Sequence, residues 1–366
     1  IRHRGFSEPG FQTVAGQDPT TGLDATSNPI ESVATLPAVK PYGADLHGQS
    51  VETIGTKTGG ESFRFARDYA LLDVAAHQGN DFQITDAFWK RINKVTRDYY
   101  KPGSFVTFPG YEWSGNTPLG GDRNVWFTRE GGPIIRSSLE LLPGGQSAWP
   151  TASTAAALFD QLRDQNRPEP FYCAHVGGRY ADLASHDPGR EYAVEVHSAW
   201  GTFEWMIDEA LSRGYRVGIS GNSDGHKGRP GASYPGAGKF GSLGGLTCYL
   251  ARRLDRRGIL ESMRARRFYA TTGNRPLITF SATDEDSGRS VPMGAVLNGA
   301  GSVVLKGAVV GTGPVEKVEL RGRDGAIASF TNTSLEELGA RIKVTWRGAK
   351  VRGRDRMVRW DGSLEV

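Results

Sequence analysis

Histidines and carboxylates recur at the ends of short apolar runs in the first three-quarters of this sequence. Of its seven histidines, four lie at or just beyond the carboxyl end of a run with the composition of a β-strand: His47, His175, His197 and His226. Acidic residues take similar positions, with Glu112 in PGYEWSG and Asp224 in SDGH. Imidazole nitrogens and carboxylate oxygens together form the ligand set of zinc, manganese or iron. The pattern therefore predicts a site for divalent metal ions.

The spacing within two of these motifs supports the same interpretation. In DLHGQS the residues Asp45, His47 and Gln49 alternate, so their side chains would point to one face of an extended strand end. Asp224 and His226 have the same spacing. A single histidine at a strand end is more often a hydrogen-bonded structural residue, and a lone carboxylate often caps a loop. Six such residues on one rim favour metal binding, and bound metal would make hydroxide available near neutral pH.

Strand-like runs alternate with helical patterns between residues 41 and 275. Helical spacing of apolar residues occurs at 61–71, 154–165, 202–213 and 255–266. The alternation predicts an α/β fold of βα units with a parallel sheet, which at this length would close into a barrel with its sites at the carboxyl ends of the strands. Residues 114–153 interrupt the rhythm as an insertion with one extra strand at 124–127. The seven strand-like runs are 44–47, 72–77, 104–111, 170–175, 192–197, 215–220 and 245–250.

Residues 1–40 and 276–366 differ from the middle of the chain in composition and in hydropathy pattern. Residues 1–40 are polar and rich in Gly, Pro and Thr, which predicts an irregular lead-in. They lack the apolar core of a secretory signal and resemble the interior or processed start of a longer precursor, so the compartment stays open. Residues 276–366 consist of alternating segments divided by Gly, Asp and Asn turns, which predicts a smaller antiparallel β-sandwich domain.

Composition narrows the classes of partner. A net charge of +4 is too small to indicate a nucleic-acid partner by itself. The basic clusters at 252–267 and 341–359 lack the interleaved aromatics of a nucleic-acid-binding surface. No apolar run approaches the ~18 residues that a membrane span needs. The two cysteines, Cys173 and Cys248, lie in apolar stretches and are expected to be buried free thiols. The oligomeric state is left open.

The order of the motifs resembles the PHP (polymerase and histidinol phosphatase) superfamily of metal-dependent phosphoesterases, over roughly residues 42–275. The likeness is to a poorly characterised branch with a trailing β domain, and it implies a distorted (β/α)7 TIM-like barrel. The family motif D-L-H-x-H matches from Asp45, with Gln49 in place of the second histidine. The motif L-D-(x)4-T-D-H-(N/D) puts Asn80 where the family has a histidine and leaves His77 one step outside. The later motifs are intact: Glu112 in GYE, His175 in FYCAH, His197 in VEVH, and Asp224 with His226 in DGH.

The resemblance implies one to three divalent ions, of zinc, manganese or iron. Glu112 would bridge two of them. His77 is either a further ligand or a residue that points into the barrel wall. Because asparagine is a poorer ligand than imidazole, we expect one or two firmly bound ions and a weak or absent third. The implied ligands are His47, Asp224 and Gln49 for the first ion, His175 and His197 for the second, and His226 with Asn80 for the third.

The resemblance also implies hydrolysis of a phosphoric mono- or diester by metal-bound hydroxide. Asp224 would be catalytic, and His197, His226 or a water would protonate the leaving group. Cations near the motifs favour a small anionic, phosphorylated substrate, although any one of them could equally be a solvated surface side chain. These candidate substrate contacts are Lys57, Arg123, Arg179 and Lys227.

Two other interpretations stay open from the sequence. Related barrels hydrolyse C–N and C–O bonds with similar ligands, but an amidohydrolase usually carries H-x-H and a metal-bridging lysine, neither of which is visible. A non-catalytic module would keep a degraded metal site for structure and recognise a polymer such as glycan.

Overall fold

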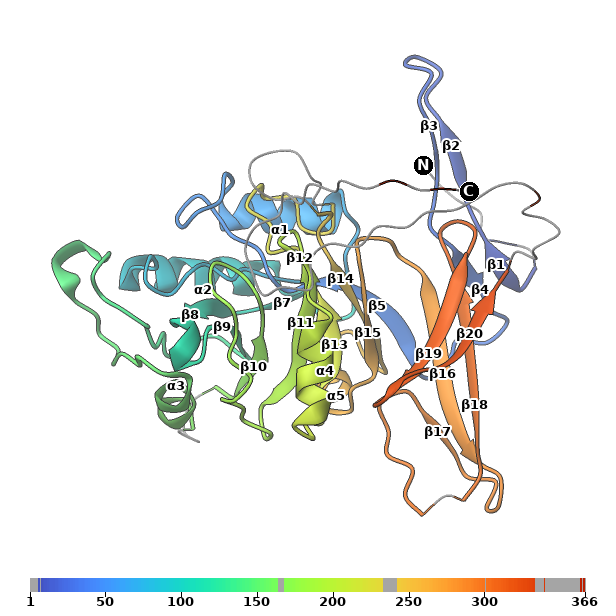
Figure 1. The fold of residues 1–366 in the computed structure, drawn as a ribbon. Helices are drawn as coiled ribbons and strands as arrows, with labels where there is room; N and C mark the ends of the chain where they lie inside the picture. The colour runs from blue at the N-terminus through green and yellow to red at the C-terminus, as the bar shows by residue number, and fades with distance from the viewer. Residues whose placement is uncertain are drawn as a thin grey trace.

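A computed structural model of the chain describes residue 6, residues 8–163, 168–232, 242–299 and 301–332, and residues 339, 363 and 365. These residues form a mixed α/β structure in which many short strands are combined with few helices (Figure 1). In the part of the chain so described, no helix is both long and apolar enough to cross a membrane.

One sheet combines parallel and antiparallel strands in the order β15-β14-β5-β6-β7. The three strands β5, β6 and β7 run parallel, whereas β14 runs antiparallel to β5 and β15 antiparallel to β14. The carboxyl ends of β5 and β6 therefore meet at the same edge. The bounds are β5 (Lys40–Asp45), β6 (Val74–Ala76), β7 (Val106–Phe108), β14 (Leu246–Ala251) and β15 (Phe268–Thr271).

A second sheet has the order β12-β11-β10-β9-β8, and β13 also pairs with β11. Strands β8, β9 and β10 are antiparallel neighbours, whereas β10, β11 and β13 run parallel. The bounds are β8 (Gly110–Ser114), β9 (Asp122–Phe127), β10 (Pro170–Ala174), β11 (Glu191–Ser198), β12 (Gly201–Thr202) and β13 (Gly218–Gly221).

The expected (β/α)7 barrel is not shown: the described strands between residues 40 and 271 form two sheets, and no closed barrel is detected among them. The run at 104–111, expected as one strand, is two strands that belong to different sheets. Pro109 lies between them, and proline cannot donate to a ladder. The extra strand of the insertion, β9, also lies within the second sheet, antiparallel between β8 and β10.

The two sheets share a core and are joined at one edge. Isolated bridges pair Gly48 with Gly225 and Asn80 with Glu112 across the sheets. Below that edge, the indole N–H of Trp126 in β9 donates to the carbonyl of Leu46, 3.1 Å away. The apolar cluster here draws on both sheets and is fully or nearly fully buried. It includes Leu46, Val74, Phe108, Trp126, Phe171 and Ala193.

Five α-helices lie within the described residues, and four of them fall in the segments predicted to be helical. Threonine or aspartate caps most of them: Thr58 forms a capping box with Glu61, and Asp255 accepts from the Gly258 N–H. The helix α2 was not predicted, although the Thr85 side chain caps it. The helices are α1 (Gly59–Asp68), α2 (Asp86–Tyr99), α3 (Ala155–Gln161), α4 (Trp205–Ser212) and α5 (Arg256–Arg264), with short 3-10 turns at Thr117–Leu119 and Pro143–Gly145.

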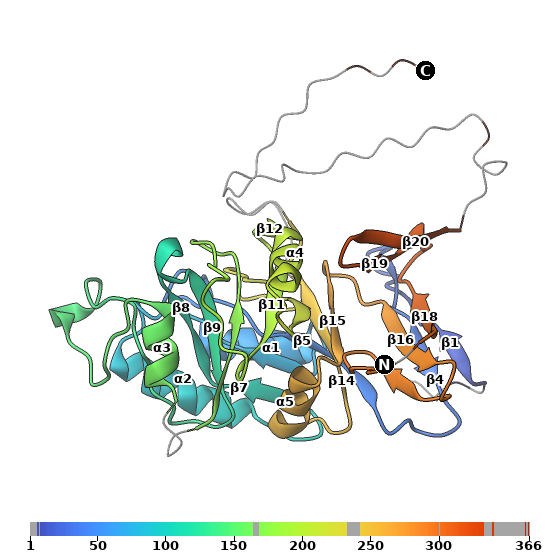
Figure 2. The same ribbon diagram turned by 60° about the horizontal axis from the view of Figure 1, so that its bottom comes forward.

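The strands β1, β4, β16 and β18 lie on the side of the molecule away from α2 and α3, as Figures 1 and 2 both show. The expected irregular lead-in contains two antiparallel pairs, β1 with β4 and β2 with β3. The C-terminal strands are antiparallel, as the alternation predicts. Most of residues 333–366 lie outside the described residues, including the basic cluster at 341–359. The bounds are β1 (Gly10–Gln12), β2 (Ala15–Gln17), β3 (Asp24–Thr26), β4 (Ile30–Ser32), β16 (Leu277–Asp284), β17 (Ser290–Pro292), β18 (Val303–Val310), β19 (Lys317–Gly322) and β20 (Gly325–Thr331).

Candidate metal centre

Buried histidines and carboxylates from both sheets converge at the edge where the sheets are joined. His47 lies just beyond β5 and Asp224 just beyond β13, while His175 follows β10 directly. Their donor atoms form three groups, each lying within 4.8 Å, and all the members are buried. The groups are His47, Glu112 and Asp224; Glu112, Asp122 and His175; and His47, His175 and Glu195.

Glu112 lies between two of these groups. Its Oε2 is 3.6 Å from His47 Nε2, and the same nitrogen is 3.3 Å from Asp224 Oδ1. Its Oε1 is 3.7 Å from His175 Nε2. One carboxylate therefore offers one oxygen to each of two donor groups, which is the geometry of a bridging ligand.

Several buried donor atoms here have no hydrogen-bond partner among the described residues. Both ring nitrogens of His175 are unpaired, as are His47 Nε2 and Asp122 Oδ1. Buried polar atoms are nearly always paired, so convergent unpaired ones indicate a group that they hold. Nitrogen and carboxylate donors within 4.8 Å of one another suit zinc, manganese or iron. The residues present therefore fit a divalent cation.

The electrostatics of the centre point the same way. Burial acts to lower the pKa of His47, but Asp224 and Glu195 together raise it well above its usual value. Burial acts to raise the pKa of Asp224, but His47 holds it below the usual range. Burial and the neighbouring Glu112 raise the pKa of Asp122 well above normal. Without another cation, the carboxylates thus compete for protons and for His47, and a divalent ion would relieve that competition.

Backbone features hold two of the donors in place. Asp224 has a φ of 45°, in the left-handed region that non-glycine residues rarely adopt. Asp45 stabilises this loop because its Oδ1 accepts from the Ser223 N–H at 2.9 Å. A Cβ at Gly177 would lie 2.9 Å from His175 Cε1 and 3.1 Å from Asp122 Oδ2, so only glycine leaves room for both side chains.

Gln49, expected as a ligand of the first ion, has a different role in the structure. Its Nε2 donates to Glu112 Oε2 at 2.7 Å. Its Oε1, the atom that would bind a metal, accepts from Thr53 Oγ1 at 2.7 Å. Because the amide oxygen is already engaged, the structure places Gln49 as a hydrogen-bond donor that orients Glu112.

His197, expected both as a ligand and as a catalytic residue, lies outside the three donor groups that the described residues form. Its Nδ1 is 2.7 Å from Thr202 Oγ1, and its Nε2 is 2.9 Å from the Leu243 carbonyl. A register shift in the β11–β13 pairing separates His197 from Glu195, so the two residues do not follow simple strand alternation. Glu195 is the member of the VEVH motif that reaches the centre.

The residues expected at a third ion lie around the centre rather than in it. The Asn80 amide donates to Ser114 Oγ at 3.0 Å, and that hydroxyl donates to Glu112 Oε1. His226 Nε2 lies 3.5 Å from Asp224 Oδ1, and its side chain is 14% exposed. His77, a possible ligand, is buried with its Nε2 2.8 Å from Ser50 Oγ, and burial lowers its pKa to about 4.

The four candidate substrate cations have different surroundings. Arg179 is half-buried; its backbone N–H donates to Asp122 Oδ2 at 2.6 Å, and its guanidinium carbon lies 5.4 Å from the centroid of the Phe82 ring. Lys227 is half-buried, and Lys57 is exposed.

Arg123 is placed in the core rather than at a substrate. It is fully buried and pairs with Glu191 at 3.1 Å, while its other N–H groups donate to carbonyls of the loop at Asp182 and Ser185. Strand alternation explains the difference, because Arg123 points to the opposite face of β9 from Asp122 and Asn124.

Asp122 and Glu195 were not among the site residues predicted from the sequence. The signals were present: DRNVWF alternates Asp122, Asn124 and Trp126 on one face, and VEVH contains Glu195. The expected extra strand began two residues too late, at 124, so Asp122 was left in a loop.

Comparisons with known proteins give distant matches. A family model described as a protein of unknown function (DUF3604) matches residues 22–166. An uncharacterized protein of Chlamydia pneumoniae is 23% identical over 339 residues, covering 86% of this chain and 52% of its own length. An uncharacterized protein of Chlamydia trachomatis is 25% identical over 357 residues, covering 89% of this chain and 54% of its own. The chain thus spans about half the length of the curated relatives it matches.

Among solved structures, one match is a two-domain protein from Bacteroides vulgatus, described as containing a predicted PHP-like metal-dependent phosphoesterase. It shares 13% identity, with coverage of 82% of this chain and 97% of that one, and a TM-score of 0.46. The evidence for function comes from the residues of the centre themselves.

Proposed function

We propose that this protein is a metal-dependent hydrolase of phosphoric mono- or diesters. The observation that carries the proposal is the convergence of buried, unpaired nitrogen and oxygen donors on both sides of Glu112. Divalent ions, when bound, supply a Lewis acid that activates a water nucleophile and polarises the phosphoryl oxygen. The motif order that resembles the PHP superfamily supports the choice of a phosphoric ester over a C–N or C–O bond.

The ligand set we propose comes from two of the donor groups. His47 and Asp224 would hold one ion and His175 and Asp122 a second, and Glu112 belongs to both donor groups. This set differs from the one expected from the sequence, since Asp122 replaces His197. Gln49 and Ser114 donate to the two oxygens of Glu112, which keeps the carboxylate turned toward both groups.

The half-buried residues at this rim are suited to an anionic substrate. Arg179 is tied through its backbone to Asp122, and its guanidinium supplies a positive charge next to the centre. Lys227 follows His226 directly. His226 is partly exposed and lies beside Asp224, a position from which it would donate a proton to the leaving group.

A panel of chromogenic phosphomono-, di- and triesters, assayed with zinc, manganese and iron, tests the proposal. We expect metal-dependent turnover that falls at least about 10³-fold in Asp224→Ala, because the ligand and its buried charge are lost together. Asp208→Ala, an exposed aspartate on α4, is the matched control and should keep the wild-type rate.

The other outcomes separate the alternatives. Turnover of amide or lactone substrates without phosphoester turnover would replace the proposal with an amidohydrolase-like activity. Tight saccharide binding with no turnover would indicate the non-catalytic module. An Asp224→Ala protein as active as wild type would rule out the proposed centre altogether.

A further inference from the structure

We infer that Glu195 is a positioning residue: it holds His47 so that the Nε2 atom of that histidine, and not Nδ1, faces the metal centre. The inference rests on the proposed function, because it concerns the ligand role of His47. Among the described residues, Glu195 shares no donor group with Glu112 or Asp224, and it acts through the imidazole ring of His47.

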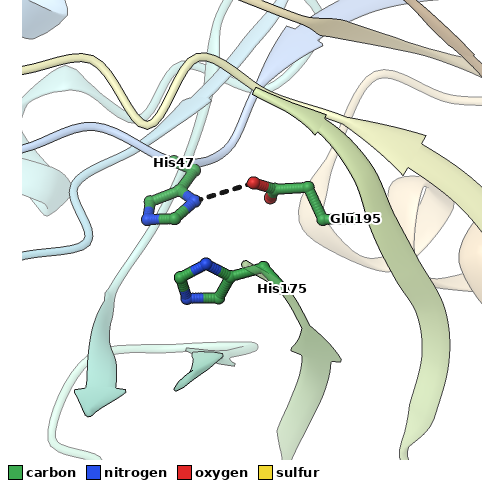
Figure 3. Close-up of side chains that lie close together, drawn as sticks. All are labelled: His47, His175 and Glu195. Carbon is green, nitrogen blue, oxygen red and sulfur yellow. Dashed lines mark hydrogen bonds and ion pairs between the residues drawn. The ribbon is translucent and has the colours of Figure 1, made fainter. Parts of the chain in front are cut away.

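The first step is the contact between the two side chains. His47 Nδ1 and Glu195 Oε1 are 3.0 Å apart, and both residues are almost completely buried (Figure 3). An ionised carboxylate can only accept a hydrogen bond, so the proton of this bond belongs to Nδ1. In the neutral ring, Nε2 then carries the free electron pair, and it lies 3.3 Å from Asp224 Oδ1 and 3.6 Å from Glu112 Oε2.

The second step is that Glu195 is itself held from several sides. Asn222 Nδ2 donates to Glu195 Oε2 at 2.7 Å, and Asn222 Oδ1 accepts from the backbone N–H of Leu46 at 2.8 Å. Asn222 just beyond β13, Glu195 within β11, and Leu46 and His47 just beyond β5 are thus connected in a closed circuit of contacts. This circuit of contacts fixes the orientation of the His47 imidazole plane as well as the position of its proton.

Among the residues that the structure describes, Asn124 makes the competing contact at His47 Nδ1. Its Nδ2 is also 3.0 Å from His47 Nδ1, and would donate there only if Nδ1 had no proton. The same Nδ2 lies 3.4 Å from Glu195 Oε2, so it has an acceptor in the carboxylate when Nδ1 is protonated. The arrangement with the proton on Nδ1 leaves every donor with an acceptor.

A direct ligand role for Glu195 is the alternative, since it shares a donor group with His47 and His175. Its two oxygens already accept from His47 and Asn222, whereas the nitrogens of His175 are unpaired. Carboxylates that orient a metal-bound histidine in this way typically change metal affinity by 10–100-fold when they are removed.

Two matched variants test the inference: Glu195→Gln and Glu191→Gln. Glu191 lies on the same strand, is equally buried, and pairs with Arg123 and His186 instead. Glutamine at 195 would present an N–H₂ group to the donors around it, so one pairing must be lost. We expect Glu195→Gln to bind zinc 10–100-fold more weakly with the same number of ions per chain, and Glu191→Gln to stay within threefold of wild type.

An unchanged zinc affinity in Glu195→Gln would remove the positioning role, and the loss of one ion per chain would make Glu195 a ligand instead.

Selective ¹⁵N-histidine labelling supplies a readout that does not depend on activity or metal uptake. With the His47 signals assigned by His47→Gln, we expect Nδ1 to carry a proton in both metal-free and zinc-loaded protein. An Nδ1 atom without a proton in either form would overturn the inference. If wild-type protein bound no zinc, the proposed function would fail, while the metal-free spectra would still test Glu195: the His47 ring signals should change in Glu195→Gln and stay as in wild type in Glu191→Gln, and signals unchanged in Glu195→Gln would remove its role.

Discussion

His175 lies directly beyond β10 and His197 near the end of the neighbouring strand β11, yet their rings have opposite surroundings. Both nitrogens of His175 are buried without a hydrogen-bond partner among the described residues, whereas both nitrogens of His197 are bonded to a hydroxyl and a carbonyl. The two residues are the same type at the same kind of position. The free electron pairs left after local hydrogen bonding, rather than the residue type, therefore make His175 the better candidate ligand of the two.

Two carboxylates at this edge, Asp81 and Asp122, also differ in whether their oxygens are fully hydrogen-bonded. Asp81 accepts from the backbone N–H groups of Ser114 and Ser137, and so holds loops. Asp122 accepts from the Arg179 N–H through one oxygen and leaves the other unpaired next to Glu112 and His175.

The largest expected effect comes from exchanging the two histidines for alanine. His175→Ala should weaken binding of the second ion at least about 100-fold and reduce turnover by about 10³-fold, because a ligand is lost from a buried site. His197→Ala should change each quantity by less than about tenfold. Isothermal titration with zinc, together with phosphoester turnover, measures both. Equal losses in the two variants would erase the distinction between these histidines.

His77 should show the opposite, purely structural behaviour in its pH dependence. Burial lowers its pKa from 6.5 to about 4, so between those pH values the unfolded chain binds a proton there that the folded chain does not. The free energy of unfolding therefore decreases as the pH falls from 6.5 to 4, by up to about 3 kcal/mol for this group.

Urea unfolding in chelator, for wild type and His77→Asn, isolates this contribution. Burial raises the pKa values of Asp45 and Asp81 to about 6. Their effect has the opposite sign, with stability rising as the pH falls, and it is common to both proteins. We expect the change in the free energy of unfolding from pH 7 to pH 4.5 to be more positive in the variant than in wild type, because the variant lacks the loss that comes from His77. Identical pH profiles would show that His77 is not buried as a neutral ring.

A smaller effect tests whether the backbone leaves room for the unpaired donors. At Gly177 an added Cβ would push against His175 and Asp122, whereas at Gly178 the nearest atom, Asp122 Oδ2, is 4.0 Å away. Gly177→Ala should weaken metal affinity by about tenfold, and Gly178→Ala should leave it within twofold. Equal affinities in the two variants would indicate that the donors do not depend on this close approach.

Local patterns predicted the elements of the site better than they predicted the way those elements assemble. Strand-end positions identified Glu112, His175 and Asp224, and the structure brings them together because the strand ends meet at one edge. The division of 104–111 at Pro109 was missed, since a single proline in an apolar run does not reveal that two sheets share that run. His197 lies outside the donor groups of the described residues, and the register shift beside it could not be predicted because it depends on the neighbouring strand.

Anomalous scattering from crystals grown with zinc or manganese would locate the bound ions of the proposed centre. We expect one peak between His47 Nε2, Glu112 and Asp224, and a second between Glu112, Asp122 and His175. Crystals with no peak beside Glu112, or with the ion bound at His197 instead, would contradict the proposal.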